Sequence, residues 1–256
     1  SPPDLVAYPI ALEKLLGVTP TPKPIPPPPG QPNKNRLKHS FKCLAFSRDG
    51  KRLASGTEDG EIQLWDAASG KELRQLQPNK LGYYYTSIDQ IAFSPNGKLI
   101  VNCSDDRSIK LWDSSSGQLL STFDDQPGTM LQKSKILAVG FGPDGKRISS
   151  GTASPDDKIR TWEVETGKLL SDLEITHPEN ELGNYTALAF TPSMDSFVVS
   201  SNFASYLYDA TTAKPTRTVP GLGDNWPKVT VSADGRKAMM TNGRELSIVE
   251  LATGTK

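Results

Sequence analysis

One short pattern that occurs five times constrains the fold of this chain more than any other feature. An apolar run ends in an aromatic or branched residue, and in the clearest copies a turn of the type Ser-x-Asp-Gly or Ser-x-Asn-Gly follows. The aligned positions are spaced 47, 48, 49 and 41 residues apart, and they are Phe46, Phe93, Phe141, Phe190 and Val231. Internal periods of this length indicate a repeat architecture, in which neighbouring units stack to bury a continuous core.

Each repeat has the pattern of several short strands. In the first repeat, an apolar stretch leads into Asp49-Gly50, which is a strong hairpin signal. Further strands are predicted over residues 52–56, 61–66 and 71–77. No segment shows sustained helical periodicity. The sequence therefore predicts an all-β fold built from four-stranded antiparallel units.

Composition excludes several classes of function. The 29 Lys and Arg residues balance 29 Asp and Glu residues, which argues against general electrostatic binding of nucleic acid or of an anionic membrane. No run of about 18 apolar residues is present, so no membrane span is expected. Cys43 and Cys103 lack the paired spacing of a zinc site, and His39 and His177 are the only histidines. We therefore expect a soluble globular protein without a metal or cofactor. Two thiols favour the cytoplasm but leave the compartment open.

Proline is concentrated at the start of the chain. Eleven of the 21 prolines fall within the first 32 residues, including the run Pro26–Pro29. Proline cannot donate a backbone hydrogen bond and favours the extended polyproline II conformation. We therefore predict that residues 1–37 form a proline-rich leader or linker and that residues 38–256 form the repeat domain. The alternative is that residues 24–29 are a ligand for an aromatic-lined groove.

The third predicted strand of the first two repeats ends in Trp-Asp, at Trp65-Asp66 and Trp112-Asp113. Together with the repeated turns, these dipeptides resemble the WD-repeat family of β-propellers. The resemblance implies four-stranded blades arranged radially around a central channel. The fifth repeat reaches the turn at Thr253-Gly254 without a fourth strand. The first hypothesis is a closed five-bladed ring, present as a monomer. The alternative is an incomplete larger ring, which another chain or an omitted region would complete.

The resemblance also implies a hydrogen-bonded network of His, Ser or Thr, Asp and Trp inside each blade. A reader could take the His, Ser and Asp of the first repeat for a hydrolase triad. The second repeat, however, places Thr86 and Asn102 at two of these positions, which would destroy a triad but only weaken a structural network. We therefore expect a structural role and no catalysis. The network positions are His39, Ser55, Asp59 and Trp65 in the first repeat, Asp106 and Trp112 in the second, and Trp162 in the third.

In propellers of this family, the loops that lead from one blade into the next lie on one face, and this face usually binds partners. The corresponding segments here carry aromatic residues, and nearby turns carry basic ones, which are typical of protein interfaces. We expect a non-catalytic interaction platform, a scaffold, adaptor or targeting module that binds a protein or peptide partner. The alternative for any single aromatic residue is that it caps the core between blades. The candidate contacts are Tyr83, Tyr84, Tyr85, Tyr185, Trp226, Arg107, Lys158 and Arg244.

The alternative function is that of an enzyme or a small-ligand binder that uses the central channel. Such a site needs polar groups that converge at the mouth of the channel, and Asp89 and Lys228 are scattered candidates. The sequence contains no phosphate-binding glycine loop and no recognisable activated nucleophile. Because one fold can host many functions, the fold alone does not decide between these two classes.

Overall fold

The computed structural model describes residues 40–76, 87–124, 134–176, 185–201, 204–220, 228–241 and 244–255. These residues form 19 strands and belong to the compact unit His39–Lys256. None of them forms a helix that could cross a membrane. The linker predicted for residues 1–37 lies outside the described residues.

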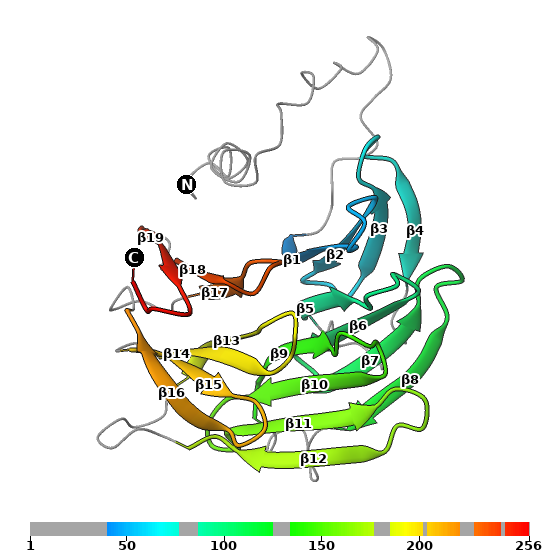
Figure 1. Ribbon diagram of the computed structural model, residues 1–256. Coiled ribbons are helices and arrows are strands. Elements are labelled where there is room, and N and C mark those ends of the chain that lie inside the picture. The colour runs from blue at the N-terminus through cyan, green and yellow to red at the C-terminus, as the bar shows by residue number, and fades with distance from the viewer. Residues whose placement is uncertain are drawn as a thin grey trace. The chain divides into compact units, whose positions relative to one another are not determined.

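The strands form five antiparallel sheets, or blades, in which consecutive strands are hydrogen-bonded neighbours (Figure 1). Blade 1 consists of β1 (Phe41–Phe46), β2 (Arg52–Thr57), β3 (Ile62–Asp66) and β4 (Glu72–Leu76). Blade 2 consists of β5 (Ile88–Phe93), β6 (Leu99–Ser104), β7 (Ser108–Asp113) and β8 (Leu119–Asp124). Blade 3 consists of β9 (Ile136–Phe141), β10 (Arg147–Thr152), β11 (Lys158–Glu163) and β12 (Leu169–Glu174). Blade 4 consists of β13 (Tyr185–Phe190), β14 (Ser196–Ser201), β15 (Ser205–Asp209) and β16 (Lys214–Val219). Blade 5 consists of β17 (Lys228–Val231), β18 (Lys237–Thr241) and β19 (Leu246–Glu250).

This architecture confirms the predicted all-β propeller with five blades. Each of the first four repeats forms a four-stranded antiparallel blade, and the inner strands β1, β5, β9, β13 and β17 surround a central channel (Figure 1). Blade 5 has three strands among the described residues. This agrees with the fifth repeat, whose pattern ends at the turn that follows its third strand.

The hydrophobic core lies between blades. Ile91, Ile100 and Trp112 of blade 2 pack against Ala54 and Leu64 of blade 1. Equivalent clusters join blade 2 to blade 3, blade 3 to blade 4, and blade 4 to blade 5. A single sheet cannot bury both of its faces, so each blade depends on its neighbours for stability, as in other repeat proteins.

The Ser-x-Asp-Gly turn and its variants form the inner hairpins of the blades for a local reason. In blade 1, Ser47 Oγ donates to Asp49 Oδ1 (2.6 Å), and the Arg52 N–H donates back to Ser47 Oγ (2.9 Å). Gly50 has a φ of 69°, a left-handed conformation that costs glycine little. In blade 4, Met194 occupies the corresponding position with a φ of 58°. Hydrogen bonds from the turn therefore hold this conformation even without glycine.

Gly56 of β2 offers a test of the packing between blades 1 and 2. A Cβ atom at this position would lie 2.6 Å from Cys43 Sγ and 2.8 Å from Ile88 Cβ. Ile88 is buried and branched at Cβ, so it cannot move away without disturbing its strand. We expect Gly56→Ala to reduce the free energy of unfolding by about 1–3 kcal/mol, measured by urea denaturation.

Gly140 of β9 provides the matched control for this substitution. The nearest atom to a Cβ at Gly140 would be the sulfur of Met194 at 3.7 Å, which is an ordinary van der Waals contact. Gly140→Ala should leave stability unchanged or raise it slightly, because alanine restricts the unfolded chain. Equal losses in the two variants would show that the tight contact at Gly56 is not the cause.

Candidate functional site

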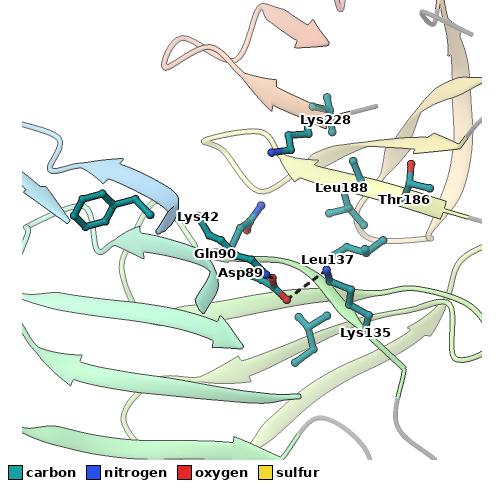
Figure 2. A pocket seen from close by; sticks show the side chains of 12 residues that line it. Lys42, Asp89, Gln90, Lys135, Leu137, Thr186, Leu188 and Lys228 are labelled. Atoms are coloured by element: carbon teal, nitrogen blue, oxygen red, sulfur yellow. Dashed lines mark ion pairs between the residues drawn. The ribbon is translucent and has the colours of Figure 1, made fainter. Parts of the chain in front are cut away.

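All five inner strands begin at the same end of the channel, which we call the channel mouth. The inner strands of blades 2 to 5 each follow a segment that lies outside the described residues. A cavity of about 460 Å³ opens at the channel mouth (Figure 2). It is lined by Phe41, Lys42, Asp89, Gln90, Lys135, Ile136, Leu137, Thr186, Ala187, Leu188, Lys228 and Val229.

β-Bulges place four of the side chains that line this cavity. In blades 1 to 4, the register of the inner strand shifts near its start, and one residue is left without a partner in the ladder. Bulges of this kind turn a side chain away from its regular direction and are frequent beside functional sites. The bulged residues are Lys42, Asp89, Leu137 and Thr186, and all four line the cavity.

Two lysines lie beside one carboxyl group at the channel mouth, and a third lysine lines the same cavity. Asp89 lies 3.7 Å from Lys42 Nζ and 3.5 Å from Lys135 Nζ. Lys228 extends from β17 into the same space and forms no ion pair within the described part of the chain (Figure 2). The arrangement leaves more positive than negative charge around the cavity.

The environment of Asp89 weakens its negative charge further. Burial raises the pKa of Asp89, Lys135 opposes this effect, and a hydrogen bond with the Asp105 carboxyl group raises the pKa again. The net pKa lies above the ordinary value for aspartate. The side chain is mostly buried, so water screens these interactions only partly. The channel mouth is therefore suited to attract a negatively charged group.

Gln90 links the inner strand that carries Asp89 to the inner strand of the next blade. Its Oε1 accepts a hydrogen bond of 2.9 Å from the Val139 N–H, which links β5 of blade 2 to β9 of blade 3. A connection between the backbone of one blade and a side chain of the next limits how far the strands can separate. The charged groups at the channel mouth thus project from a rigid frame.

Buried ion pairs hold the turns between the second and third strands. Lys110 Nζ lies 2.6 Å from Asp106, and Arg160 contacts both oxygens of Asp156 at 2.6 and 3.0 Å. Burial raises the pKa of Asp156, but hydrogen bonds from Arg160 and Thr152 outweigh it, and the net pKa lies below the ordinary value. The bidentate pair of Arg160 and Asp156 fixes geometry as well as charge. Both ion pairs hold the turns on which they lie.

The structure places the predicted partner contacts in different environments. Tyr185 is buried, and its hydroxyl lies 2.9 Å from the Tyr208 hydroxyl. This position is the one expected for an aromatic residue that caps the core between blades. Arg107 and Arg244 lie on turns between second and third strands. Lys158 pairs with Asp172 at 3.2 Å. Tyr83, Tyr84, Tyr85 and Trp226 lie outside the described residues. A role of these residues in binding stays a prediction.

Two links of the predicted structural network are present. Trp65 Nε1–H donates to Ser55 Oγ (2.8 Å), and Trp112 Nε1–H donates to Asn102 Oδ1 (2.7 Å). Asp106 instead accepts hydrogen bonds from Ser104, Ser108 and Lys110. Trp162 is buried beside Phe123, and the centroids of the two rings are 5.9 Å apart. Asp59 lies on the turn between β2 and β3. His39 and Thr86 lie outside the described residues.

Asp89 and Lys228 are candidates that the sequence shows as scattered, and the structure places both in the lining of one cavity. Lys42 and Lys135 are not among the candidates that the sequence suggests. A signal for Lys42 was present, because Lys42 and Asp89 each precede the aligned phenylalanine of their repeat by four residues. Lys135 lies upstream of the repeated pattern, so the alignment of repeats carries no signal for it.

Comparison with known proteins agrees with this architecture. Residues 26–139, fewer than half of the 256, match the β-propeller family described as Nucleolar protein 10-like, N-terminal domain. The chain is a β-propeller with five blades. The matched part of this propeller includes Lys42, Asp89 and Lys135, whereas Lys228 lies beyond it.

Proposed function

We propose that this propeller is a non-catalytic platform that binds an acidic segment of a protein or peptide partner at the channel mouth. The observation that carries the proposal is the convergence of Lys42, Lys135 and Lys228, from three different blades, on one open cavity. Lysine ammonium groups attract carboxylates and other anionic groups at close range. Propellers commonly bind proteins, which supports the same assignment.

The chemistry of the lining favours binding over catalysis. Its polar side chains are lysine, aspartate, glutamine and threonine. Among the described residues around the cavity, no nucleophile is paired with a base that could activate it. Asp89 is held between two lysines and in contact with Asp105, an arrangement that tunes charge and positions the lysines.

The proposal predicts how single substitutions change the affinity for an acidic probe. The probe is a fluorescein-labelled oligoglutamate peptide, and its binding is measured by fluorescence anisotropy at low salt. We expect Lys42→Ala, Lys135→Ala and Lys228→Ala each to weaken binding by roughly two- to fivefold, the range for partly exposed charge pairs. Asp89→Asn should strengthen binding, because it removes the negative charge from the site. Added salt should weaken binding in every case.

Lys71→Ala is the matched control, because Lys71 is exposed on a turn between β3 and β4, away from the cavity lining. Its affinity should equal that of the unaltered protein. Equal effects of all four lysine substitutions, or equally tight binding of an oligolysine peptide, would refute the proposal. Efficient competition by free glutamate would instead identify the cavity as a small-ligand site.

A further inference from the structure

A second cavity, of about 300 Å³, lies between blades 3 and 4, which are neighbours in the ring (Figure 1). Strands β10, β11 and β12 form one wall, and the ends of two hairpins of blade 4 form the other. We call it the interblade cavity. It shares no described lining residue with the cavity at the channel mouth, so the two are separate sites.

Small polar residues of blade 3 open the interblade cavity. Ser149 and Thr161 are paired across β10 and β11, and both line it. In the other four-stranded blades the corresponding pair is apolar and packs in the core toward the following blade. These pairs are Ala54 and Leu64, Val101 and Leu111, and Val198 and Leu207. Blade 3 therefore has hydroxyl groups and free space at a place where the other blades have a filled core.

The two hydroxyl groups can bind an acceptor in the cavity. Ser149 Oγ and Thr161 Oγ1 lie 2.8 Å apart and form one hydrogen bond with each other. The hydroxyl that accepts this bond keeps a proton of its own for a further partner. Ser149 is only 8% exposed, so a bond made here competes little with water. An oxygen atom that enters the cavity is therefore a suitable partner for this pair.

Arg52 of blade 1 shows what an arginine at the start of a second strand can bind. It donates to the Gly97 carbonyl oxygen at 2.6 Å and to Ser114 Oγ at 3.0 Å, both on turns of blade 2. Its guanidinium also lies 5.4 Å from the centre of the Phe93 ring. This position of blade 1 thus binds oxygen acceptors of the following blade beside an aromatic ring.

Arg147 holds the same position in blade 3, but blade 4 does not accept it in this way. Met194 and Ala210 stand where blade 2 has Gly97 and Ser114. A Cβ atom at Gly97 would overlap the guanidinium of the arginine in blade 1, so a residue larger than glycine blocks that arrangement. Alanine also lacks the hydroxyl that accepts the second hydrogen bond. Arg147 consequently lies at the rim of the interblade cavity, with its side chain 54% exposed.

The charge of the lining favours an anionic occupant. Among the described residues that line the interblade cavity, only Arg147 is charged. Its ion pair in the described part of the chain runs from Nε to Asp144 at 3.8 Å, which is a weak, exposed contact. The planar guanidinium group can bind both oxygens of a carboxylate at once. The cavity is therefore complementary to a single carboxylate.

The rest of the lining favours an apolar side chain. Leu170 and Leu173 of blade 3 line the cavity together with Phe190 and Met194 of blade 4. The volume of about 300 Å³ is at the lower end for ligand sites, so it suits one large side chain and excludes large cofactors. Leu170, at a bulge of β12, is 48% exposed at the surface. An occupant is thus covered only in part, as the end of a peptide is.

We propose that the interblade cavity binds the carboxyl-terminal residue of a partner peptide that ends in a large apolar residue such as leucine. The apolar side chain packs between the leucines of β12 and Met194, and the terminal carboxylate pairs with Arg147. A terminal residue carries both groups together, which a cavity of this size requires. The hydroxyl pair of Ser149 and Thr161 donates to an oxygen of the same peptide.

The test uses the peptide Gly-Ser-Gly-Ser-Gly-Leu with fluorescein at its amino end and a free carboxyl end. Its binding to the full chain is measured by fluorescence anisotropy. The same peptide with a terminal carboxamide should bind roughly two- to fivefold more weakly, because it lacks the charge that pairs with the guanidinium. A peptide that ends in serine should bind more than about tenfold more weakly, because it buries no apolar side chain.

Three variants of the protein locate the site. Arg147→Gln should weaken binding roughly two- to fivefold, whereas Arg48→Gln, at an exposed turn of blade 1, should leave it unchanged. Ser149→Ala combined with Thr161→Leu recreates the apolar pair of blade 1 and fills the cavity. This double variant should lose binding while its midpoint of urea unfolding stays the same or rises, which shows that the chain still folds.

A second measurement follows the methionine methyl groups by nuclear magnetic resonance after ¹³C labelling. The unlabelled peptide should shift the signal of Met194, which lines the cavity, and leave that of Met240, which is buried in blade 5, unchanged. The proposal is overturned if the carboxamide peptide or the cavity-filled variant binds equally well. It is also overturned if Lys228→Ala weakens binding, which would place the peptide at the channel mouth. Equal affinity of free N-acetyl-leucine would show a small-molecule site and likewise overturn it.

Discussion

Trp112→Ala is expected to reduce the free energy of unfolding by about 3–5 kcal/mol, the usual cost of truncating a buried aromatic side chain. Trp112 is buried between blades 1 and 2, where it packs in the interblade core, and its Nε1–H donates to Asn102. Removal of the indole leaves a cavity and also an unsatisfied amide oxygen. Urea denaturation followed by circular dichroism measures the loss.

Trp65→Ala is the matched comparison, because Trp65 occupies the same position in blade 1 and donates a similar hydrogen bond to Ser55. No blade covers its outer side, so we expect a loss of only about 1 kcal/mol. The difference between the two variants measures what a preceding blade contributes. If the two losses were equal, Trp65 would be as well covered as Trp112 in the isolated protein.

The comparison of these two tryptophans also shows how far the sequence predicts the fold. The propeller could be predicted because its signals are local: the turn at Ser47, Asp49 and Gly50 closes through its own hydrogen bonds. The dipeptides Trp65-Asp66 and Trp112-Asp113 are local signals too, because each one marks the end of a third strand. The exposure of Trp65 could not be predicted, because its sequence context is that of a buried position. Burial depends on whether a neighbouring blade is present.

The candidate site was predictable only in part. The sequence showed that Asp89 belongs to an inner strand, but its direction depends on a bulge against β6. A bulge is a feature of the pairing between two strands, and a shift of one residue moves a side chain to the other face. The convergence of Lys42, Asp89 and Lys228 also requires three blades to meet at one channel. Pattern analysis of single repeats contains no information on this arrangement.

Arg160→Met is expected to reduce the free energy of unfolding by about 2–3 kcal/mol at pH 7. Arg160 is buried, pairs with both oxygens of Asp156 and lies 3.2 Å from Asp172. Loss of the guanidinium leaves a half-buried carboxylate without its main partner, which is costly. The expected value is below the cost of breaking a fully buried pair, because Asp156 and Asp172 retain contact with water.

The loss of unfolding free energy in Arg160→Met should become smaller as the pH falls. The pKa of folded Asp156 lies below the ordinary value, so its ion pair stabilises the protein above about pH 4 and this contribution declines as the pH falls. The difference between Arg160→Met and the unaltered protein should therefore shrink between pH 7 and pH 3. Arg147→Met is the control, because Arg147 and Asp144 form an exposed pair at 3.8 Å and should contribute less than about 1 kcal/mol. A loss that is independent of pH would show that packing of the arginine stem, and not its charge, holds this turn.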